Sequence, residues 1–400
     1  MKKKNLLLII LLGCYYVCFL SHAQRLPYLI SLEKEIRNIK PTNLSEIGSS
    51  ITYIPLETSD DCLLKSLRKV IVSDKHLLVS DADRILLFDT SGHFITEIGR
   101  KGQGPGEYIG WFDFCFSWDR SKIFILTNFT NRCLEYNLEG KFLNSFQIES
   151  LATKMRPLND SLFVFHPTNQ PLFDNTWEGS PNENSLIISD LYNNIEKTFK
   201  NHHKLAKTNF VMWGGSGAFY SFEGNIRFKE HGANADTLFT VTVNELIPYA
   251  VFDLGNKKMP VEIVVPNKSR PNAFDEALRP FQGKFFLASI REDSNNLYFR
   301  LSDWRNDLYG YYCKLSNSVF VIGEQGFQND LDGGITFVPI SVSYTDALVS
   351  WIDAYQLRDH VLNSDTIEMK KKYGDKSEVL IKLMNSLDDE SNPVLILVNK

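Results

Sequence analysis

Four histidines in the middle of the chain carry the side chain that most often ligates zinc. They are His166 in FHP, His202 and His203 in NHHK, and His231 in KEHG. Neutral imidazole is a good zinc ligand, but no HExxH or HxH spacing occurs here, so separate loops would have to converge. We therefore name these four as candidate metal ligands and expect them to be surface-loop histidines.

An acidic stretch partly resembles a calcium-binding loop. In QNDLDGG, residues 328–334, Asp330 and Asp332 fit the third and fifth positions of such a loop. Gln328 and Pro339 stand at its first and twelfth positions, where charged ligands belong. We interpret the stretch as an Asx-rich turn. The sequence therefore allows calcium or zinc as a cofactor, but it identifies no site for either metal.

A glycine-rich stretch around Ser216 comes within one residue of the GxSxG motif of serine hydrolases. That motif needs a strand before the serine and a helix after it. Here VMWGGSGAFY, residues 211–220, continues as the strand-like AFYSF. We do not expect Ser216 to be a nucleophile. Trp213 beside the glycines is instead a candidate platform for a sugar ring or a peptide side chain.

A second glycine-rich stretch, GRKGQGPGEY at residues 99–108, has the composition of a phosphate loop. A phosphate loop leads into a helix, whose N-terminal amides hold the anion. The residues that follow, YIGWFDFCF, alternate in polarity as a strand does. We therefore predict a tight structural joint between two strands, from which Arg100 can still project toward a ligand.

The elements that must position these residues are short strands in a repeating order. Residues 76–99 align with residues 122–146 at a period of 47 to 48 residues. Each unit contains strands separated by tight turns of the type Asp/Asn-x-x-Gly. The turn residues are Asp89, Gly92, Asn137 and Gly140. Repeats of about 40 to 50 residues with four strands each form β-propeller blades, and the chain has room for six.

Weaker copies of the repeat continue along the chain, at residues 186–199, 236–255, 296–323 and 346–359. An open ring of blades would expose a sheet edge, so we expect residues 51–57 and 393–399 to pair and close it. Residues about 364–391 have apolar side chains at helical spacing. These are Val379, Leu380, Leu383 and Leu387. We expect one or two helices there, outside the ring and before the closing strand.

Three segments carry a resemblance to a known family. They are IGRKGQGPGEY at 98–108, YIPLET at 53–58 and NPVLILVNK at 392–400. Together they resemble the largely uncharacterised six-bladed β-propeller proteins exported by Bacteroidetes, which are similar to NHL-repeat propellers. The resemblance implies an all-β fold and export, without implying a reaction.

The predicted organisation is a signal peptide at 1–23, a lead-in segment at 24–50 and a propeller at 51–400. Residues 1–23 contain three lysines, an apolar run and the sequence Ser-His-Ala, which is a signal-peptidase pattern. A rival cut at Leu-Leu-Gly-Cys14 resembles a lipobox. We favour the cut after Ala23, because the apolar run continues past Cys14. We therefore expect a periplasmic or secreted protein, with an outer-membrane lipoprotein anchored through Cys14 as the alternative.

The net charge of the chain narrows the class of partner. The formal net charge is −5, and the loss of the three signal lysines makes it −8. Such a balance argues against nucleic acid as a partner.

The cysteines outside residues 1–23 are too few for a disulfide framework, so we expect them to be small buried apolar groups. These are Cys62, Cys115, Cys133 and Cys313.

Two functions from different classes fit this chain, because propellers host both binding proteins and enzymes. We predict a non-catalytic recognition or scaffold module for a glycan, a peptide or an envelope protein. The alternative is a metal-dependent hydrolase or lyase at the central channel, which Asp81, Asp83 and Asp113 could approach. The candidate ligand-binding residues are Trp177 in the polar insertion WEGSPNENS, Trp213, Arg300, Trp304 and Arg100.

Overall fold

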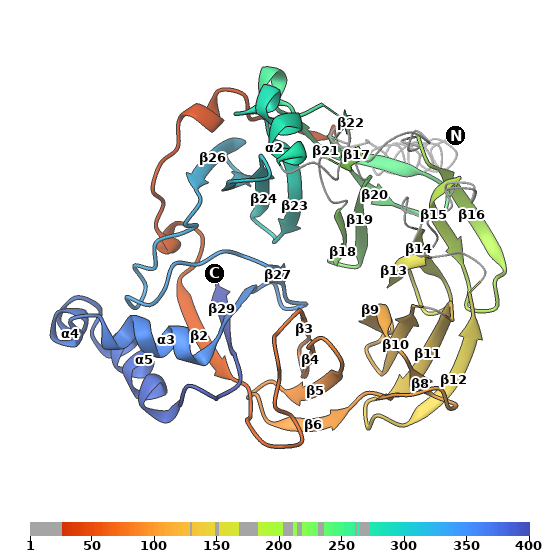
Figure 1. Ribbon diagram of the computed structural model, residues 1–400, viewed down its shortest axis with the longest axis horizontal. Helices are drawn as coiled ribbons and strands as arrows, with labels where there is room; N and C mark the ends of the chain where they lie inside the picture. The colour runs from red at the N-terminus through yellow and green to blue at the C-terminus, as the bar shows by residue number, and fades with distance from the viewer. Residues whose placement is uncertain are drawn as a thin grey trace, which may run out of the picture.

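The strands form six sheets that stand around a central axis (Figure 1). The computed structural model describes residues 26–128, 130–148, 152–167, 183–202, 211–213, 218–230, 236–260, 262–264 and 272–400. Within each sheet, one edge strand lies at the channel and the other strands lie progressively further out. The predicted all-β, six-bladed β-propeller with helices before its last strand is therefore confirmed.

The blades are numbered along the chain, and their strands are given from the channel outward. Blade 1 contains β3 (Lys69–Val72), β4 (His76–Ser80), β5 (Ile85–Asp89) and β6 (Phe94–Glu97). Blade 2 contains β9 (Trp111–Phe116), β10 (Lys122–Thr127), β11 (Arg132–Asn137) and β12 (Phe142–Gln147). Blade 3 contains β13 (Ala152–Pro157), β14 (Phe163–Pro167), β15 (Asn184–Ser189) and β16 (Ile195–Lys200).

Blade 4 contains β18 (Ala218–Phe222), β19 (Asn225–Lys229), β20 (Thr237–Val241), β21 (Leu246–Asp253) and β1 (Tyr28–Ser31). Blade 5 contains β23 (Phe286–Glu292), β24 (Asn296–Ser302), β25 (Asp307–Cys313) and β26 (Ser318–Gly323). Blade 6 contains β27 (Ser341–Val342), β28 (Leu348–Ile352), β29 (Val394–Asn399) and β2 (Ser50–Pro55). The short pairs β7 (Arg100–Lys101) with β8 (Glu107–Tyr108), and β17 (Val211–Trp213) with β22 (Glu262–Val264), lie between blades in sequence.

An apolar cluster fills each interface between neighbouring blades. Between blades 1 and 2, for example, Leu78 and Ile85 pack with Phe114 and Ile123. Cys115 and Cys133 lie in the next cluster, between blades 2 and 3, as small buried apolar groups. Burying one Leu or Phe side chain contributes about 2 kcal/mol, so these clusters hold the inner strands in fixed positions around the channel.

Segments from the N-terminal and C-terminal parts of the chain meet in blade 6. β2 pairs antiparallel with β29, from Ser50 opposite Asn399 to Pro55 opposite Val394, and β29 also pairs with β28. Asn392, just before β29, is buried, and its side-chain Oδ1 accepts a hydrogen bond from the Leu64 amide at 2.8 Å. The two segments that we expected to pair thus lie side by side and close the ring.

Residues 28–49, which we call the N-terminal strap, join three blades. β1 pairs in parallel with β21, which gives blade 4 a fifth strand. The strap then passes blade 5, where the Lys40 amide donates to the Val321 carbonyl at 3.1 Å. It reaches blade 6, where the Ser49 amide donates to the Asn399 carbonyl at 2.8 Å. The predicted lead-in is therefore part of the propeller.

The glycine-rich stretch at 99–108 is a joint between blades 1 and 2, as predicted. It runs from the end of β6 through β7 and β8 to the inner strand β9. Gly99 and Gly106 have φ of 70° and 72°, in the left-handed region that favours glycine. The Tyr136 hydroxyl donates to the Gly106 carbonyl at 2.7 Å, which fastens the joint to blade 2.

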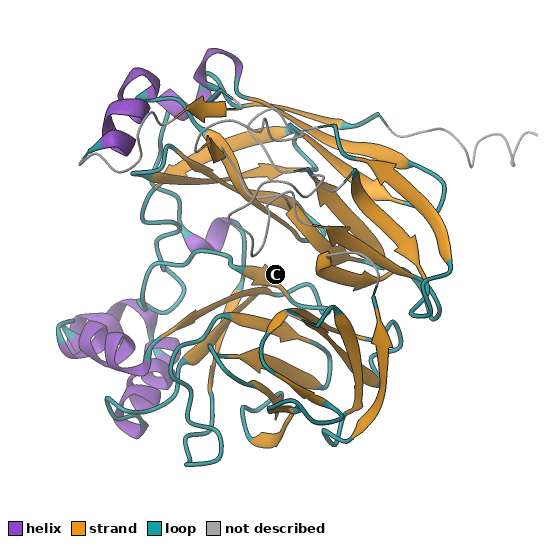
Figure 2. Cartoon of the chain, turned by 45° about the vertical axis from the view of Figure 1, so that its right-hand side comes forward, coloured by secondary structure: helices purple, strands orange, loops and turns teal. Residues whose placement is uncertain are grey.

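Helices at the periphery cover one side of the propeller (Figures 1 and 2). The helices are α2 (Ala273–Leu278), α3 (Ala354–Leu362), α4 (Thr366–Tyr373), α5 (Asp375–Ser386), η1 (Glu35–Arg37), η2 (Leu44–Glu46), η3 (Gly255–Lys257) and η4 (Arg279–Phe281). None of the helices in the described residues is long and apolar enough to span a membrane.

The C-terminal helices begin earlier than the sequence predicted. α3 starts directly after β28, so only the first part of the repeat expected at 346–359 is a strand. Leu380 is buried against the propeller with Val394 and Ile396, whereas Val379 is 63% exposed. Of the apolar residues that indicated a helix here, Leu380 thus faces the propeller and Val379 faces solvent.

The strand order defines two faces of the ring. Turns that join an inner strand to the second strand of its blade lie at one end of the channel, which we call the hairpin face. Turns that join second and third strands, and the connections between blades, lie at the other end, which we call the crossing face. Both follow from the antiparallel order of the strands in each blade.

Substitution of Gly99 tests the joint. A Cβ atom at Gly99 would lie 2.6 Å from the Tyr136 hydroxyl oxygen and 2.8 Å from Tyr108 Cε1, at a positive φ. We expect Gly99→Ala to lower the free energy of unfolding in urea by roughly 2 kcal/mol. Gly104→Ala is the matched control, since its Cβ would meet only the flexible Glu107 carboxylate. Equal effects of the two substitutions would contradict this role of the joint.

Candidate functional site

Five charged side chains on inner strands line the central channel. They come from blades 1, 2, 3 and 5, and we call them the channel cluster. They are Lys69 on β3, Asp113 on β9, Lys154 and Arg156 on β13, and Arg291 on β23. Figure 1 shows these four strands facing one another around the centre of the ring. Four cations against one carboxylate make the channel locally positive.

The Asp113 carboxylate joins three blades. Its Oδ1 accepts a hydrogen bond from Lys69 Nζ of blade 1, and its Oδ2 accepts from Arg156 Nη1 of blade 3 at 2.6 Å. The Met155 amide also donates to Oδ2, at 3.0 Å. Burial raises the pKa of Asp113, but the charges of Arg156 and Lys69 outweigh it and hold the pKa well below its ordinary value. Asp113 is therefore an ionised structural anion and a very weak base.

Three of the cations also bind a backbone carbonyl of the following blade. Lys69 Nζ donates to the Phe114 carbonyl at 2.7 Å, and Arg156 Nη2 donates to the Phe219 carbonyl at 3.4 Å. Arg291 Nε donates to the Ile340 carbonyl, and its Nη1 donates to the Ile290 carbonyl at 2.7 Å. Blades 1, 3 and 5 are thus each linked to the next blade at the channel wall.

Lys154 differs from the other cations of the cluster. In the described part of the chain, its ammonium group has no hydrogen-bond acceptor and no ion-pair partner. Burial lowers the pKa of Lys154 to about 8, and the charges of Arg156, Arg291 and Lys69 add to this effect while Asp113 opposes it. The group is therefore cationic at neutral pH but loses its proton more readily than an ordinary lysine.

The channel cluster is deep in the molecule and still open to solvent. The side chains of Lys69 and Arg156 are 25% and 15% exposed, while that of Asp113 is 6% exposed. Burial nevertheless lowers the pKa of Lys69. Lys69 and Arg156 thus keep some accessible surface although protein surrounds them.

Aromatic and cationic side chains surround the channel at the hairpin face. Trp118 and Arg120 lie in the β9–β10 turn, and Tyr344 lies in the β27–β28 turn; we call these three the rim. Trp118 and Tyr344 are 41% and 43% exposed, and the Arg120 guanidinium stands 5.3 Å from the centre of the Tyr344 ring. The Arg120 side chain also pairs with Asp74 of blade 1 at 3.2 Å.

The rim is held by contacts between blades. The Tyr344 amide donates to the Val72 carbonyl of blade 1 at 2.9 Å. Trp118 reaches the β18–β19 turn of blade 4, where a Cβ atom at Gly224 would lie 3.3 Å from its Cη2. Burial raises the pKa of the Tyr344 phenol and the charge of Arg156 opposes this, so Arg156 of the channel cluster lies near the rim.

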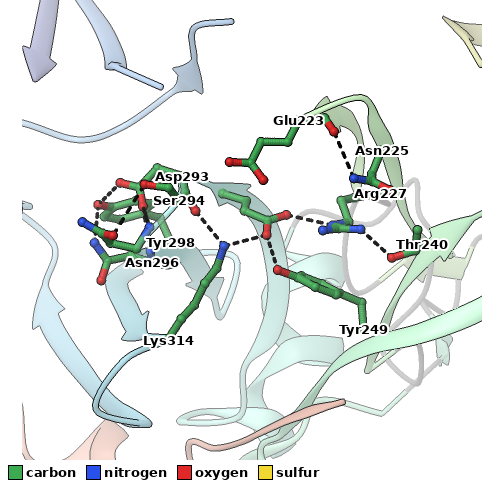
Figure 3. Close-up of polar contacts among 12 residues, drawn as sticks. Glu223, Asn225, Arg227, Thr240, Tyr249, Asp293, Ser294, Asn296, Tyr298 and Lys314 are labelled. Atoms are coloured by element: carbon green, nitrogen blue, oxygen red, sulfur yellow. Dashed lines mark hydrogen bonds and ion pairs between the residues drawn. The ribbon is translucent and has the colours of Figure 1, made fainter. Parts of the chain in front are cut away.

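A second charged group, between blades 4 and 5, is closed to solvent. The Glu292 carboxylate accepts hydrogen bonds from Arg227 Nε at 2.9 Å, from Lys314 Nζ at 2.7 Å and from the Tyr249 hydroxyl. Figure 3 shows Arg227, Tyr249 and Lys314 converging on this point from the two blades. Because the Glu292 side chain is 0% exposed and fully bonded, we assign it to the blade interface and not to ligand binding.

The ligand-binding residues predicted from the sequence lie away from the rim where the structure describes them. Arg300 is at the crossing-face end of β24 and pairs with Asp307 at 2.8 Å. Trp304 follows in the β24–β25 turn, 36% exposed and packed on Phe286 with ring centres 4.9 Å apart. Arg100 is exposed in β7. Trp177 lies outside the described residues, as does the side chain of Trp213.

The candidate metal ligands are not brought together in the described residues. His166 is buried in β14, where its Nδ1 lies 2.7 Å from the Ser185 carbonyl, and burial lowers its pKa to about 4. The expectation of a surface-loop histidine was therefore wrong for His166, because β14 is the second strand of blade 3 and is covered on both faces. His202 is exposed, and His203 and His231 lie outside the described residues.

The acidic candidates already accept hydrogen bonds from the protein. Asp330 accepts from the amide and the hydroxyl of Ser45, in the N-terminal strap, at 2.9 and 2.6 Å. Asp332 accepts from the Gly334 amide at 2.9 Å, two residues along the chain, as in an Asx turn. Asp81 caps its own turn through the amides of Asp83 and Arg84. In the described part of the chain, no three His, Cys, Asp or Glu side chains are grouped to hold a metal ion.

Sequence reasoning missed the rim and all of the channel cluster except Asp113. The rim residues occupy turns of different blades and share no motif, so only the closed ring places them together. One signal was present, since WDRSK in the β9–β10 turn combines an exposed aromatic with a cation at a position that faces the channel.

Comparison with known proteins places the chain in a family. The model of a domain of unknown function, DUF4934, matches residues 27–399, and the chain therefore belongs to that family. The search of curated proteins found no match.

Among solved structures, the chain is similar to a Bacteroides fragilis protein thought to be exported. The sequence identity is 19% and the TM-score 0.71, over 94% of this chain and 100% of that one. It is more distantly similar to the N-terminal domain of Nup159, with 10% identity and a TM-score of 0.38 over 78% and 76% of the two chains. A streptogramin B lyase has 13% identity and a TM-score of 0.33, over 75% and 93%. These likenesses concern the fold alone.

Substitution of Asp113 tests whether the carboxylate holds the channel cluster together. Asp113→Asn leaves Lys69 and Arg156 without a counter-charge, and we expect the free energy of unfolding to fall by about 3 kcal/mol. Urea is the suitable denaturant, because it leaves charge interactions unscreened. Asp83→Asn is the control, since Asp83 forms exposed pairs with Lys65 and Lys101 and its loss should leave the free energy of unfolding nearly unchanged. A similar small loss for both variants would refute this role of Asp113.

Proposed function

We propose that this chain is an exported, non-catalytic recognition protein that binds a glycan at the rim of its central channel. The observation that carries the proposal is the pair of exposed aromatic rings, Trp118 and Tyr344, at one mouth of a channel lined with cations. Exposed indole and phenol faces stack on sugar rings, because each offers a flat apolar surface with a polar edge.

The chemistry of the channel supports binding more than catalysis. Asp113 is the only carboxylate of the channel cluster, and its oxygens are bonded to Lys69, Arg156 and a backbone amide. Its low pKa makes it a poor general base, since an effective base has a pKa near the working pH. Arginine and lysine side chains that already bind backbone carbonyls are fixed in place, as preorganised ligand contacts need to be.

Export is supported by the lysines, apolar run and Ser-His-Ala sequence within residues 1–23. A glycan is also a ligand that an exported protein meets outside the cytoplasm. Peptides and envelope proteins are the competing ligands, and the negative formal charge of the chain disfavours nucleic acid.

Titration of the chain without residues 1–23 against soluble polysaccharides tests this function. The panel contains sulfated, uronate-containing and neutral glycans, followed by calorimetry. We expect saturable binding of a glycan, and Trp118→Ala and Tyr344→Ala should each weaken it about tenfold. Tyr355→Ala is the control, because Tyr355 is an exposed aromatic on α3, away from the channel.

Three results would contradict the proposal. New reducing ends or unsaturated products in the titrated glycan would make the protein an enzyme. Loss of binding in Trp304→Ala, with full binding in the two rim variants, would move the site to the crossing face. Binding of peptides alone by the rim would replace the glycan as the ligand.

A further inference from the structure

Two cations of the channel cluster have N–H donors for which the described residues provide no acceptor. Lys154 has all three N–H groups without an acceptor in the described residues, and Arg291 Nη2 likewise has none. Lys69 and Arg156 differ, because each is fixed by Asp113 and by a carbonyl of the next blade. The unused donors thus belong to β13 and β23, on different sides of the channel (Figure 1).

The charges of the cluster do not balance. Asp113 compensates one of the two cations that it bonds, and Lys154 and Arg291 are left with no carboxylate partner in the described residues. Cations held near one another away from bulk water repel strongly, because the surrounding protein screens charge far less than water does. The repulsion is relieved when an anion enters, and a doubly charged anion relieves more of it than a singly charged one.

We propose that Lys154 and Arg291, supported by Arg156 and Lys69, form a binding site in the channel for a tetrahedral oxyanion, the sulfate or phosphate group of a ligand. This deepens the proposed function and rests on it, because the oxyanion would be a substituent of the glycan that the rim binds. A guanidinium presents paired N–H donors that match two oxygens of such a group, and an ammonium adds a point charge.

The site has a predicted pH dependence that sulfate can report. Sulfate stays doubly charged throughout the neutral and alkaline range, so any change in its affinity comes from the protein. Asp113 of β9, Lys69 of β3, Arg156 of β13 and Arg291 of β23 are the charged groups around Lys154. His166 of β14 lies opposite Lys154, but burial lowers its pKa to about 4, so it stays neutral throughout the titrated range. Because the pKa of Lys154 is about 8 without an anion, the affinity should fall as the pH rises above that value.

Sulfate titration by calorimetry tests the site, with chloride added to keep the ionic strength constant. At pH 7 we expect saturable binding of one sulfate per chain, with acetate at least tenfold weaker. Lys154→Met should weaken sulfate about tenfold and remove the loss of affinity between pH 7 and pH 9.5. Lys65→Met is the control, since Lys65 is a surface lysine paired with Asp83. Inorganic phosphate at pH 7, in a parallel titration, shows which oxyanion binds more tightly.

A second variant protects the test against loss of folding. Arg291→Gln removes the charge on β23 and should also weaken sulfate, and the melting temperature of each variant without sulfate shows whether it is folded. Wild-type affinity in both folded variants, or an unchanged pH profile in Lys154→Met, would overturn the site. Sulfate binding without any glycan binding would retain the site and reject the proposed function, whereas glycan binding that ignores sulfation would do the reverse.

Discussion

Hydrogen bonds between β2 and the C-terminal strand β29 close blade 6, and the geometry of the channel depends on them. Only a closed ring places blade 6 beside blade 1, where the Tyr344 amide reaches the Val72 carbonyl. The same closure lets Arg120 of blade 2 lie over the Tyr344 ring while it pairs with Asp74. The N-terminal strap reinforces the closure by joining blades 4, 5 and 6 from outside.

Charge on the inner strands is used in two different ways. Glu292 is surrounded by donors from two blades and has no accessible surface, so its network strengthens one interface and presents nothing to solvent. Asp113 holds two cations of the channel cluster in place. Within the described residues, Lys154 keeps all of its donors and Arg291 keeps those of Nη2. A charged group that is fully bonded stabilises the ring, whereas one that keeps its donors beside an open channel can bind a ligand.

The sequence predicted structural features that are determined by residues close together in the chain. The turns at Asp89 and Asn137 are recognisable because each side chain accepts hydrogen bonds from amides within its own turn, and the glycine that follows has a positive φ. The closing strands were recognisable because a ring of blades cannot leave an edge open. The start of α3 was missed, since the residues after β28 continue with the same mixture of apolar and polar side chains. The channel cluster as a group could not be predicted from the sequence, because its members lie on four blades and come together only when the ring closes.

The position of the cations inside an acidic chain has a consequence for selectivity. The formal net charge of −5 repels anions at a distance, and salt screens this field beyond about 8 Å in physiological solution. Inside the channel the cluster attracts anions, because the protein walls exclude water and strengthen the local field. At the proposed site, a free anion would have only that short-range attraction, whereas an anion carried on a sugar ring would also gain contacts with Trp118 and Tyr344. The proposal therefore implies a preference for an acidic group that is presented on a larger ligand over the same ion in solution.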